Sequence, residues 1–314
     1  MDTMLQWGLD CIRAIQAQAN PPLTVFMRVI TEFGSATAYL VLLPFIYWCA
    51  DEKKCLKLAT VILISAWLNV ALKTFLDQPR PFFAGFDPSL DICDIRENLG
   101  GLPSGHAQNS LVLWIILASW SKKNWAYVSA AVFCLLVGFS RIYLGVHFPT
   151  DVFGGWIIAG FVLCAYFLFS RKIENFLSER SPRIGLIVCA VIAFGMTLYR
   201  PDAGIYALKN LLMPAGMILG MGTGYFLCRR YIGFSAPSNF GRTGRAKYFS
   251  LAARFFFGIT VMVVLYTASG KIVSYFEHSV NFRLYVFLRY LIVALWVSAG
   301  APWLFRTLRL AEKS

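Results

Sequence analysis

The sequence has few charged residues, and their scarcity indicates that the chain folds in a membrane and not in water. Charged residues make up 14% of the 314 residues, whereas a soluble domain has roughly 25%. Hydrophobic residues account for 58%, and the mean hydropathy is +0.62. The apolar runs leave no stretch long enough for a separate soluble domain. We therefore predict an all-α protein, built as a polytopic transmembrane helix bundle.

The sequence also lacks the patterns of a redox or metal site. Its eight cysteines form no Cys-x-x-Cys pair, and most fall inside apolar runs, which is typical of small buried side chains. No cluster of Asp and Glu, such as a divalent cation needs, accompanies the polar motifs described below. We expect neither a metal nor another cofactor.

Apolar segments close to the roughly 20 residues that span a bilayer recur along the chain. We predict about nine transmembrane helices, of which the third and the sixth are short. They cover residues 24–50, 53–77, 104–121, 124–146, 149–169, 183–199, 202–228, 251–275 and 282–305. Residues 3–19 mix apolar and polar side chains, which predicts a helix lying on the membrane surface.

Basic residues gather in alternate connections between these helices. They are Lys53, Lys54, Lys122, Lys123, Arg171, Lys172, Arg180, Arg183, Arg229, Arg230, Arg242, Arg245 and Lys247, with Arg306, Arg309 and Lys313 in the C-terminal tail. The positive-inside rule places these loops and the C-terminus in the cytoplasm, and the N-terminus outside. The remaining connections then face outward: residues 78–103, 147–148, 200–203 and 276–281. Topology thus accounts for the net charge of +13, and we expect no nucleic-acid partner.

Two cations follow one another at the outer end of the second predicted span. Lys73 lies near the end of this helix, and Arg80 follows between two prolines that cannot continue it. A single lysine at a helix end usually reaches for lipid headgroups. Here both cations can face one point outside the membrane.

The long outer connection ends in GGLPSGHAQNS, residues 100–110, directly before an apolar run. Ser104 is placed to cap the following helix, and Gly105 allows the backbone to approach a ligand closely. The free amides at a helix start bind anions. His106 lies in this first turn, in a chain with only three histidines.

The stretch SRIYLGVHFPTD, residues 140–151, joins the fourth and fifth spans on the same outer side. Pro149 suits the first turn of the fifth helix, so His147 lies just before it. Asp151, four residues after His147, can reach back to the imidazole. Arg141 lies at the end of the preceding helix.

These residue types match the chemistry of phosphate. Lys73, Arg80 and Arg141, with the helix-start amides, form a receptor for a tetrahedral anion. A neutral imidazole held by a carboxylate can attack phosphorus, and a protonated one can give its proton to the leaving oxygen. The pattern favours metal-independent phosphoryl transfer to water through a phosphohistidine.

Three segments, KTFLDQPRP, PSGH and SRIYLGVHFPTD, resemble the signature motifs of the type 2 phosphatidic acid phosphatase superfamily. That superfamily includes lipid phosphate phosphatases, glucose-6-phosphatase and vanadium haloperoxidases. The resemblance implies that His147 is the nucleophile, that Asp151 orients it and that His106 is the acid for the leaving group. It implies phosphoryl-oxygen contacts for Lys73, Arg80, Ser104, Gly105 and Arg141.

The resemblance divides the chain into an N-terminal interfacial helix (residues 1–20), a membrane phosphatase core (21–170) and additional C-terminal transmembrane helices (171–314). In the last part, Gly216, Gly220 and Gly224 form a small-residue ladder that favours close helix packing over a channel. We leave the oligomeric state open.

We predict a phosphatase that acts on a phosphate monoester or diphosphate of a lipid at the outer or lumenal leaflet, in a bacterial inner membrane with the site facing the periplasm. Membrane lipids and a lipid phosphate substrate are its expected partners. Three alternatives stand: a sugar phosphatase resembling glucose-6-phosphatase, a haloperoxidase that holds vanadate, and a non-enzymatic transporter or scaffold with a vestigial site.

Overall fold

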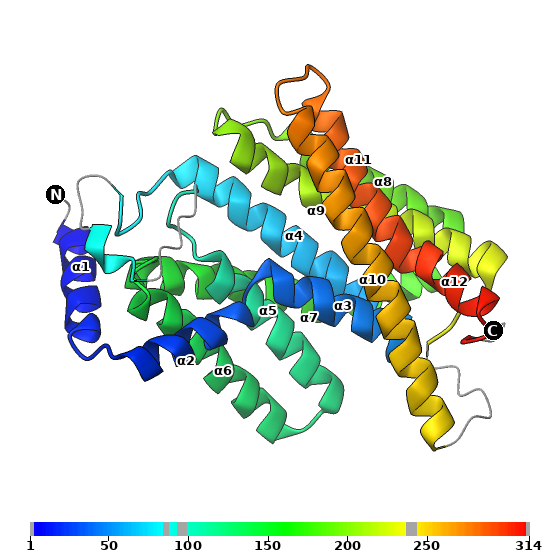
Figure 1. Cartoon of the computed structure of the whole chain (residues 1–314), viewed down its shortest axis with the longest axis horizontal. Coiled ribbons are helices and arrows are strands. Elements are labelled where there is room, and N and C mark those ends of the chain that lie inside the picture. Colours follow the sequence, from blue (N-terminus) through cyan, green and yellow to red (C-terminus); the bar gives the residue numbers. More distant parts are fainter. Residues whose placement is uncertain (1–2, 84–87, 93–98, 237–243, 312–314) are drawn as a thin grey trace. The chain divides into compact units, whose positions relative to one another are not determined.

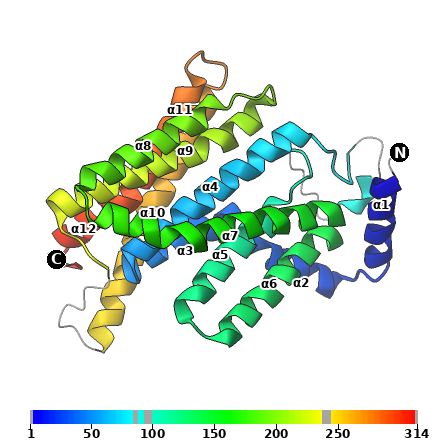
Figure 2. The ribbon, with the colours of Figure 1, turned by 180° about the vertical axis from the view of Figure 1, so that it is seen from behind.

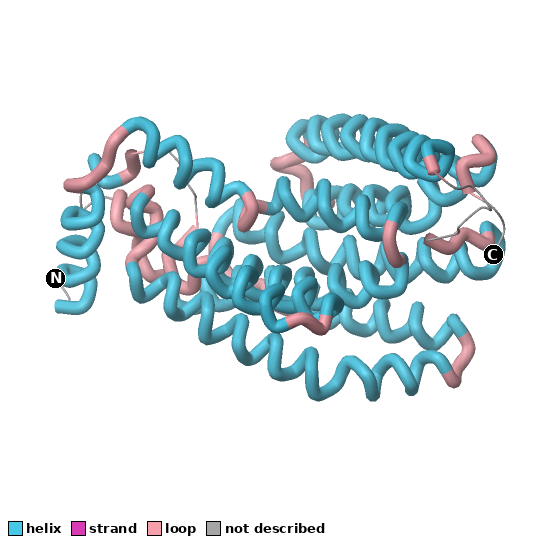
Figure 3. The backbone as a smooth tube through the Cα atoms, turned by 90° about the horizontal axis from the view of Figure 1, so that it is seen from below, coloured by secondary structure: helices cyan, strands magenta, loops and turns pink. Residues whose placement is uncertain are grey.

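The computed structural model describes residues 3–83, 88–92, 99–236 and 244–311, and their regular structure is helical with no strand (Figure 1, Figure 3). The predicted all-α class is confirmed. Cys93, Arg242 and Lys313, which were counted above, lie outside the described residues.

Twelve α-helices and three short turns of other helix types make up this structure. The α-helices are α1 (Thr3–Gln16), α2 (Pro21–Glu32), α3 (Ala36–Cys49), α4 (Glu52–Leu76), α5 (Gly105–Ser121), α6 (Asn124–Tyr143), α7 (Pro149–Ser178), α8 (Pro182–Leu198), α9 (Gly204–Leu227), α10 (Arg245–Tyr275), α11 (Phe282–Leu295) and α12 (Ala301–Thr307). The others are the 3₁₀ turn η1 (Pro88–Leu90) and the π turns η2 (Cys228–Ile232) and η3 (Trp296–Gly300).

Each predicted span falls on a helix, or on the bent pair α2 and α3 in the case of the first. Among the described residues, six helical stretches are long and apolar enough to cross a membrane: α4, α6, α7, Gly204–Ile232, Arg245–Tyr275 and Phe282–Thr307. The pair α2 and α3, bent by 49°, gives a seventh if it forms one span. α5 and α8 have 17 residues each, fewer than the roughly 20 that a span takes. Nine crossings therefore stay a prediction.

The N-terminal helix α1 is two-sided, as its sequence predicted. Leu9 and Ile12 are buried in a cluster with Phe148, whereas Trp7 is exposed. Its position on a membrane surface stays a prediction.

The chain divides into two compact units. Unit 1 comprises Met1–Ala38, Ile64–Ser170 and Pro201–Ala207, and unit 2 comprises Tyr39–Leu63, Arg171–Arg200 and Leu208–Ser314. All three sequence motifs lie in unit 1.

A helical hairpin organises unit 1. α5 and α6 pack side by side (Figure 1) and are joined by a tight turn in which Lys122 is left-handed, with φ of 56°. α2 packs on α6. Because the two helices of a hairpin run in opposite directions, the start of α5 and the end of α6 lie at the same end. This places Ser104 and Arg141, which are far apart in the sequence, near one another.

In unit 2 the glycine ladder lets α9 and α11 approach closely. A Cβ atom on Gly216 or Gly220 would overlap the carbonyl groups of Phe287 and Leu291, and one on Gly224 would overlap η3. The ladder is therefore a packing surface, as predicted.

A different face of α9 receives α8 (Figure 2). A Cβ atom on Gly222 would lie 2.6 Å from Sγ of Cys189, which is closer than two such atoms can approach. α9 is consequently packed between α8 and α11.

The packing role of the glycine ladder predicts that an alanine is more destabilising at Gly220, inside the ladder, than at Gly195, outside it. Gly220→Ala would force α9 and α11 apart, and we expect the free energy of unfolding to fall by about 1–3 kcal/mol. Gly195→Ala in α8 is the matched control, because a Cβ atom there meets nothing within 4 Å. Thermal unfolding of both variants in detergent measures the difference. An equal melting temperature for Gly220→Ala and the wild type would contradict the packing role.

Candidate active site

Asp151 and His147 form a buried pair at the start of α7. Nδ1 of His147 lies 3.1 Å from Oδ2 of Asp151, and both side chains are at most 1% exposed. The same carboxylate oxygen accepts a hydrogen bond from the backbone N–H of Phe148 at 3.0 Å. A neutral imidazole that donates from Nδ1 to this carboxylate has its lone pair on Nε2. The expected reach of Asp151 to the imidazole is thus present.

Arg80 lies on the other side of the imidazole. Its Nη1 is 3.2 Å from Nε2 of His147 and donates to the carbonyl of Val146 at 2.9 Å, while its Nε donates to the carbonyl of Leu99 at 2.7 Å. The guanidinium is fully buried. It therefore holds a fixed positive charge beside the nitrogen that carries the lone pair.

Lys73, near the end of α4, is held by the loop that precedes the second motif. Its Nζ donates to the carbonyls of Gly100 and Gly101 at 2.5 and 3.0 Å. The loop is clamped in turn, because the N–H of Gly101 donates to the carbonyl of Gln78 at 2.7 Å. Contact of Lys73 with a phosphoryl oxygen stays a prediction, and the observed role of its ammonium group is to fix this loop.

Ser104 stands at the N-cap position of α5, but its side chain makes no capping hydrogen bond. Its Oγ is fully buried and has no hydrogen-bond partner among the described residues. Burying a hydroxyl without a partner is unfavourable, so this group is available to a ligand oxygen. A Cβ on the next residue, Gly105, would lie 3.0 Å from Oδ1 of Asn69, which explains the need for glycine there.

Arg141 and His106 complete the set. Arg141 is 1% exposed, and its Nη1 donates to Oγ1 of Thr31 in α2 at 2.9 Å. His106, in the first turn of α5, is partly buried beside Gly34. Unit 1 thus gathers all eight residues that the sequence singled out.

Burial and neighbouring charge act together on His147, which lies in the connection between α6 and α7. Removal of the ring from water lowers its pKa well below the usual value, and the positive charges of Arg80 and Lys73 lower the pKa further. The imidazole is therefore kept neutral, which is the form that can act as a nucleophile.

Sequence reasoning missed several residues that hold this site. Gln78 donates from Nε2 to Oδ1 of Asp151 at 2.9 Å, and Thr31 supports Arg141. Gln78 lies inside the first motif, and Thr31 is a polar residue in an apolar helix, but neither signal identifies a partner distant in the sequence.

A buried polar chain also supports the second motif from α4. Nδ2 of Asn69 donates to the carbonyl of Pro103 at 3.1 Å and to Oε1 of Gln108 at 2.8 Å. Gln108 in turn donates to the carbonyl and the hydroxyl of Ser65, both at 2.9 Å. The start of α5 is thereby tied to α4.

Comparison with known proteins identifies relatives of this chain. Residues 54–175 match the family model of the PAP2 superfamily. Phosphatidylglycerophosphatase B of Bacillus subtilis is 31% identical over 173 residues, which are 50% of this chain and 80% of that protein. The chain belongs to the PAP2 superfamily. The predicted family and the predicted enzyme class, phosphoric monoester hydrolase, are confirmed.

Two other PAP2 phosphatases illustrate the range of similarity. Lipid A 4'-phosphatase of Bacteroides thetaiotaomicron is 33% identical over 119 residues, which are 38% of this chain and 48% of that protein. The crystal structure of the first transmembrane PAP2 type phosphatidylglycerolphosphate phosphatase from Bacillus subtilis has a TM-score of 0.48 and 26% identity, covering 56% of this chain and 90% of that one.

The C-terminal helices have a family model of their own. Residues 212–313 match the PAP2 superfamily phosphatase transmembrane extension. The match covers most of α9 and the helices after it, but not α8, so the division of the chain at residue 170 stays a prediction. Together with the apolar helices, this match shows an integral membrane protein.

The polar chain behind this PAP2 site can be tested at Asn69. Asn69→Leu would leave the backbone carbonyl of Pro103 and the side-chain oxygen of Gln108 without their donor. The cost is about 1–3 kcal/mol for each buried group. We expect a lower melting temperature together with slower phosphate release. Asn124→Leu, at an exposed position at the start of α6, is the matched control. Full activity and stability in Asn69→Leu would show that the chain of hydrogen bonds does not position the second motif.

Proposed function

We propose that this protein removes a phosphate monoester, or the terminal phosphate of a diphosphate, from a lipid at the outer leaflet of a membrane. One observation carries the proposal: Nδ1 of His147 lies 3.1 Å from the buried carboxylate of Asp151, and Nε2 lies 3.2 Å from the buried cation Arg80. In the tautomer that donates from Nδ1 to the carboxylate, Nε2 carries the lone pair. Such a nitrogen is a nucleophile aimed at a place where negative charge is stabilised.

The reaction proceeds in two steps. Nε2 of His147 attacks phosphorus and the bond from phosphorus to the leaving oxygen breaks, while His106 gives its proton to that oxygen. Asp151 stabilises the positive charge on the imidazole as its Nε2 becomes phosphorylated. In the second step, His106 takes a proton from water, the oxygen of which attacks phosphorus and releases inorganic phosphate from Nε2.

Positive side chains supply the charge stabilisation. Arg80, Arg141 and Lys73 stand around the imidazole, and the hydroxyl of Ser104 and the N–H of Gly105 complete a pocket for phosphoryl oxygens. Among the described residues, no group of three or more His, Cys, Asp and Glu side chains is arranged to hold a metal ion. We therefore propose that the reaction needs no metal.

A lipid substrate follows from where the site residues lie in the chain. The four segments that carry them are the ends of helices α4, α5, α6 and α7, at least three of which are long and apolar enough to cross a bilayer. A headgroup can meet such a site while its chains remain among apolar helices. Phosphatidylglycerol phosphate is the first candidate, because the relative with 80% coverage is named for it.

The charge of the loops gives the side of the membrane. If the basic connections are cytoplasmic, the connection that contains His147 faces outward. We propose that the enzyme resides in a bacterial inner membrane, with its site toward the periplasm.

Removal of the nucleophile tests the function directly. In excess EDTA, we expect detergent-purified wild type to release phosphate from phosphatidylglycerol phosphate, and His147→Ala to be slower by on the order of 10³-fold or more. His278→Ala is the matched control, since His278 is exposed and lies in unit 2.

The same assay, run on phosphatidic acid, undecaprenyl diphosphate and glucose 6-phosphate, ranks the substrate classes. Release only from the sugar would replace the lipid by a soluble ester. Undiminished activity in His147→Ala would contradict the phosphohistidine mechanism. Activity that requires a divalent ion would contradict the metal-free reaction.

The pH profile should fall on both sides of an optimum. His147 must be neutral to attack, and its lowered pKa places the acidic loss of kcat/KM below the usual histidine value of about 6.5. The basic loss follows because His106 must be protonated. Arg80→Gln removes a positive neighbour, so the pKa of His147 rises and the acidic loss moves to higher pH. A flat profile from about pH 5 to 9 would contradict both roles.

A further inference from the structure

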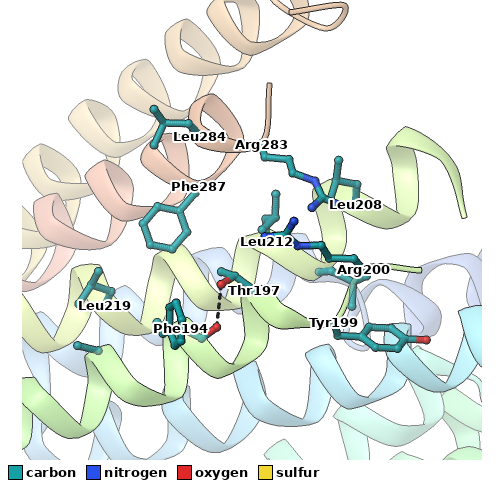
Figure 4. Close-up of a pocket in the computed structure, with 13 residues that line it drawn as sticks. Phe194, Thr197, Tyr199, Arg200, Leu208, Leu212, Leu219, Arg283, Leu284 and Phe287 are labelled. Atoms are coloured by element: carbon teal, nitrogen blue, oxygen red, sulfur yellow. Dashed lines mark hydrogen bonds between the residues drawn. The ribbon is translucent and has the colours of Figure 1, made fainter. Parts of the chain in front are cut away.

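Unit 2 contains a cavity that the phosphatase chemistry does not use. It has a volume of about 340 Å³ and lies between α8, α9 and α11 (Figure 4). Its wall is almost entirely apolar, with Phe194, Leu212 and Phe287 among the lining side chains. Pockets that hold small ligands have volumes of roughly 300–1,000 Å³, so the cavity is large enough for part of an amphiphile.

Two arginines stand in the wall of this apolar cavity. Arg200 follows α8 in the connection to α9, and Arg283 lies in the first turn of α11. Figure 4 shows the two side chains reaching toward each other beside Leu208 and Leu212. Arg200 lies in one connection that the loop charges place on the outer side of the membrane, and Arg283 lies just after another.

Neither arginine is neutralised within the part of the chain that the structure describes. Arg200 and Arg283 have no hydrogen-bond or ion-pair partner among those residues. Lys209, in the first turns of α9, differs in this respect, because its Nζ lies 3.1 Å from Oε2 of Glu277. The carboxylate of Glu277 is thus paired with the lysine.

Two guanidinium groups over an apolar cavity match one class of ligand. Guanidinium binds phosphate through paired hydrogen bonds, and the cavity below accepts a hydrocarbon chain. We infer that unit 2 binds one anionic phospholipid, with its headgroup phosphate between Arg200 and Arg283 and an acyl chain between α8, α9 and α11. This site lies outside the catalytic motifs and would exist whatever substrate the enzyme hydrolyses.

Native mass spectrometry of the full chain, released from detergent with added phosphatidylglycerol or phosphatidylcholine, tests the site. We expect Arg200→Gln/Arg283→Gln to bind phosphatidylglycerol about tenfold more weakly than the wild type, because charge-assisted contacts to the phosphate are lost. The matched control is Arg171→Gln/Arg245→Gln, which removes the same charge from two exposed arginines of unit 2. It should bind as the wild type does.

A second pair of variants tests whether the apolar cavity binds the acyl chain of the lipid. Thr197 lines the cavity, and Thr197→Trp would place a large side chain in it while keeping both arginines in the chain. Thr267→Trp is the control, because Thr267 is exposed on α10 and its hydroxyl bonds within its own helix, as that of Thr197 does. We expect only Thr197→Trp to weaken the binding of phosphatidylglycerol.

Three outcomes would overturn the inference. Equal binding of phosphatidylglycerol by the wild type and the double arginine variant would exclude the headgroup contact. Equal retention of phosphatidylcholine and phosphatidylglycerol would show an apolar cavity without anion selectivity. Displacement of phosphatidylglycerol by inorganic phosphate alone, with no effect of Thr197→Trp, would show a simple anion site. Melting temperatures of all variants establish that each is folded.

Discussion

The Asp151 residue is the point through which the three sequence motifs are joined. Its carboxylate accepts from His147 at 3.1 Å within the third motif and from Gln78 at 2.9 Å in the first. Its backbone carbonyl accepts from the N–H of Ser104, in the second motif, at 2.8 Å. A Cβ on Gly101 would lie only 2.7 Å from the same carboxylate. One buried acid therefore fixes the helix ends that carry the site, and the imidazole is oriented as part of the same network.

Gathering positive side chains in a buried place is unfavourable unless they are hydrogen-bonded. Arg80 and Lys73 donate to backbone carbonyls, and Arg141 donates to a threonine hydroxyl. These acceptors are neutral, so the contacts satisfy donors without cancelling positive charge.

The local parts of this arrangement could be predicted from the sequence. Apolar runs indicated the helices, and the spacing of four residues let Asp151, in the first turn of α7, reach back to His147 just before that helix. The role of Gln78 could not be predicted, because its contact with Asp151 depends on the path of a loop between them. Ser104 shows a similar limit: the pattern indicated an N-cap, and the residue stands at that position, but its buried hydroxyl makes no capping hydrogen bond. The lengths of α5 and α8 likewise limit what hydropathy alone says about the number of crossings.

Under the proposed mechanism, phosphate binding at this site would exchange contacts instead of adding them. Arg80 already lies against Nε2 of His147, and Lys73 is already bonded to the loop at Gly100. A bound phosphoryl group must draw some of these donors away from their present acceptors, so the net gain in ground-state binding is small. The same donors are fixed in place before the substrate arrives, and they need little rearrangement when negative charge develops at the phosphoryl oxygens. Such a site favours the transition state over the bound substrate, because its hydrogen bonds strengthen as that charge grows.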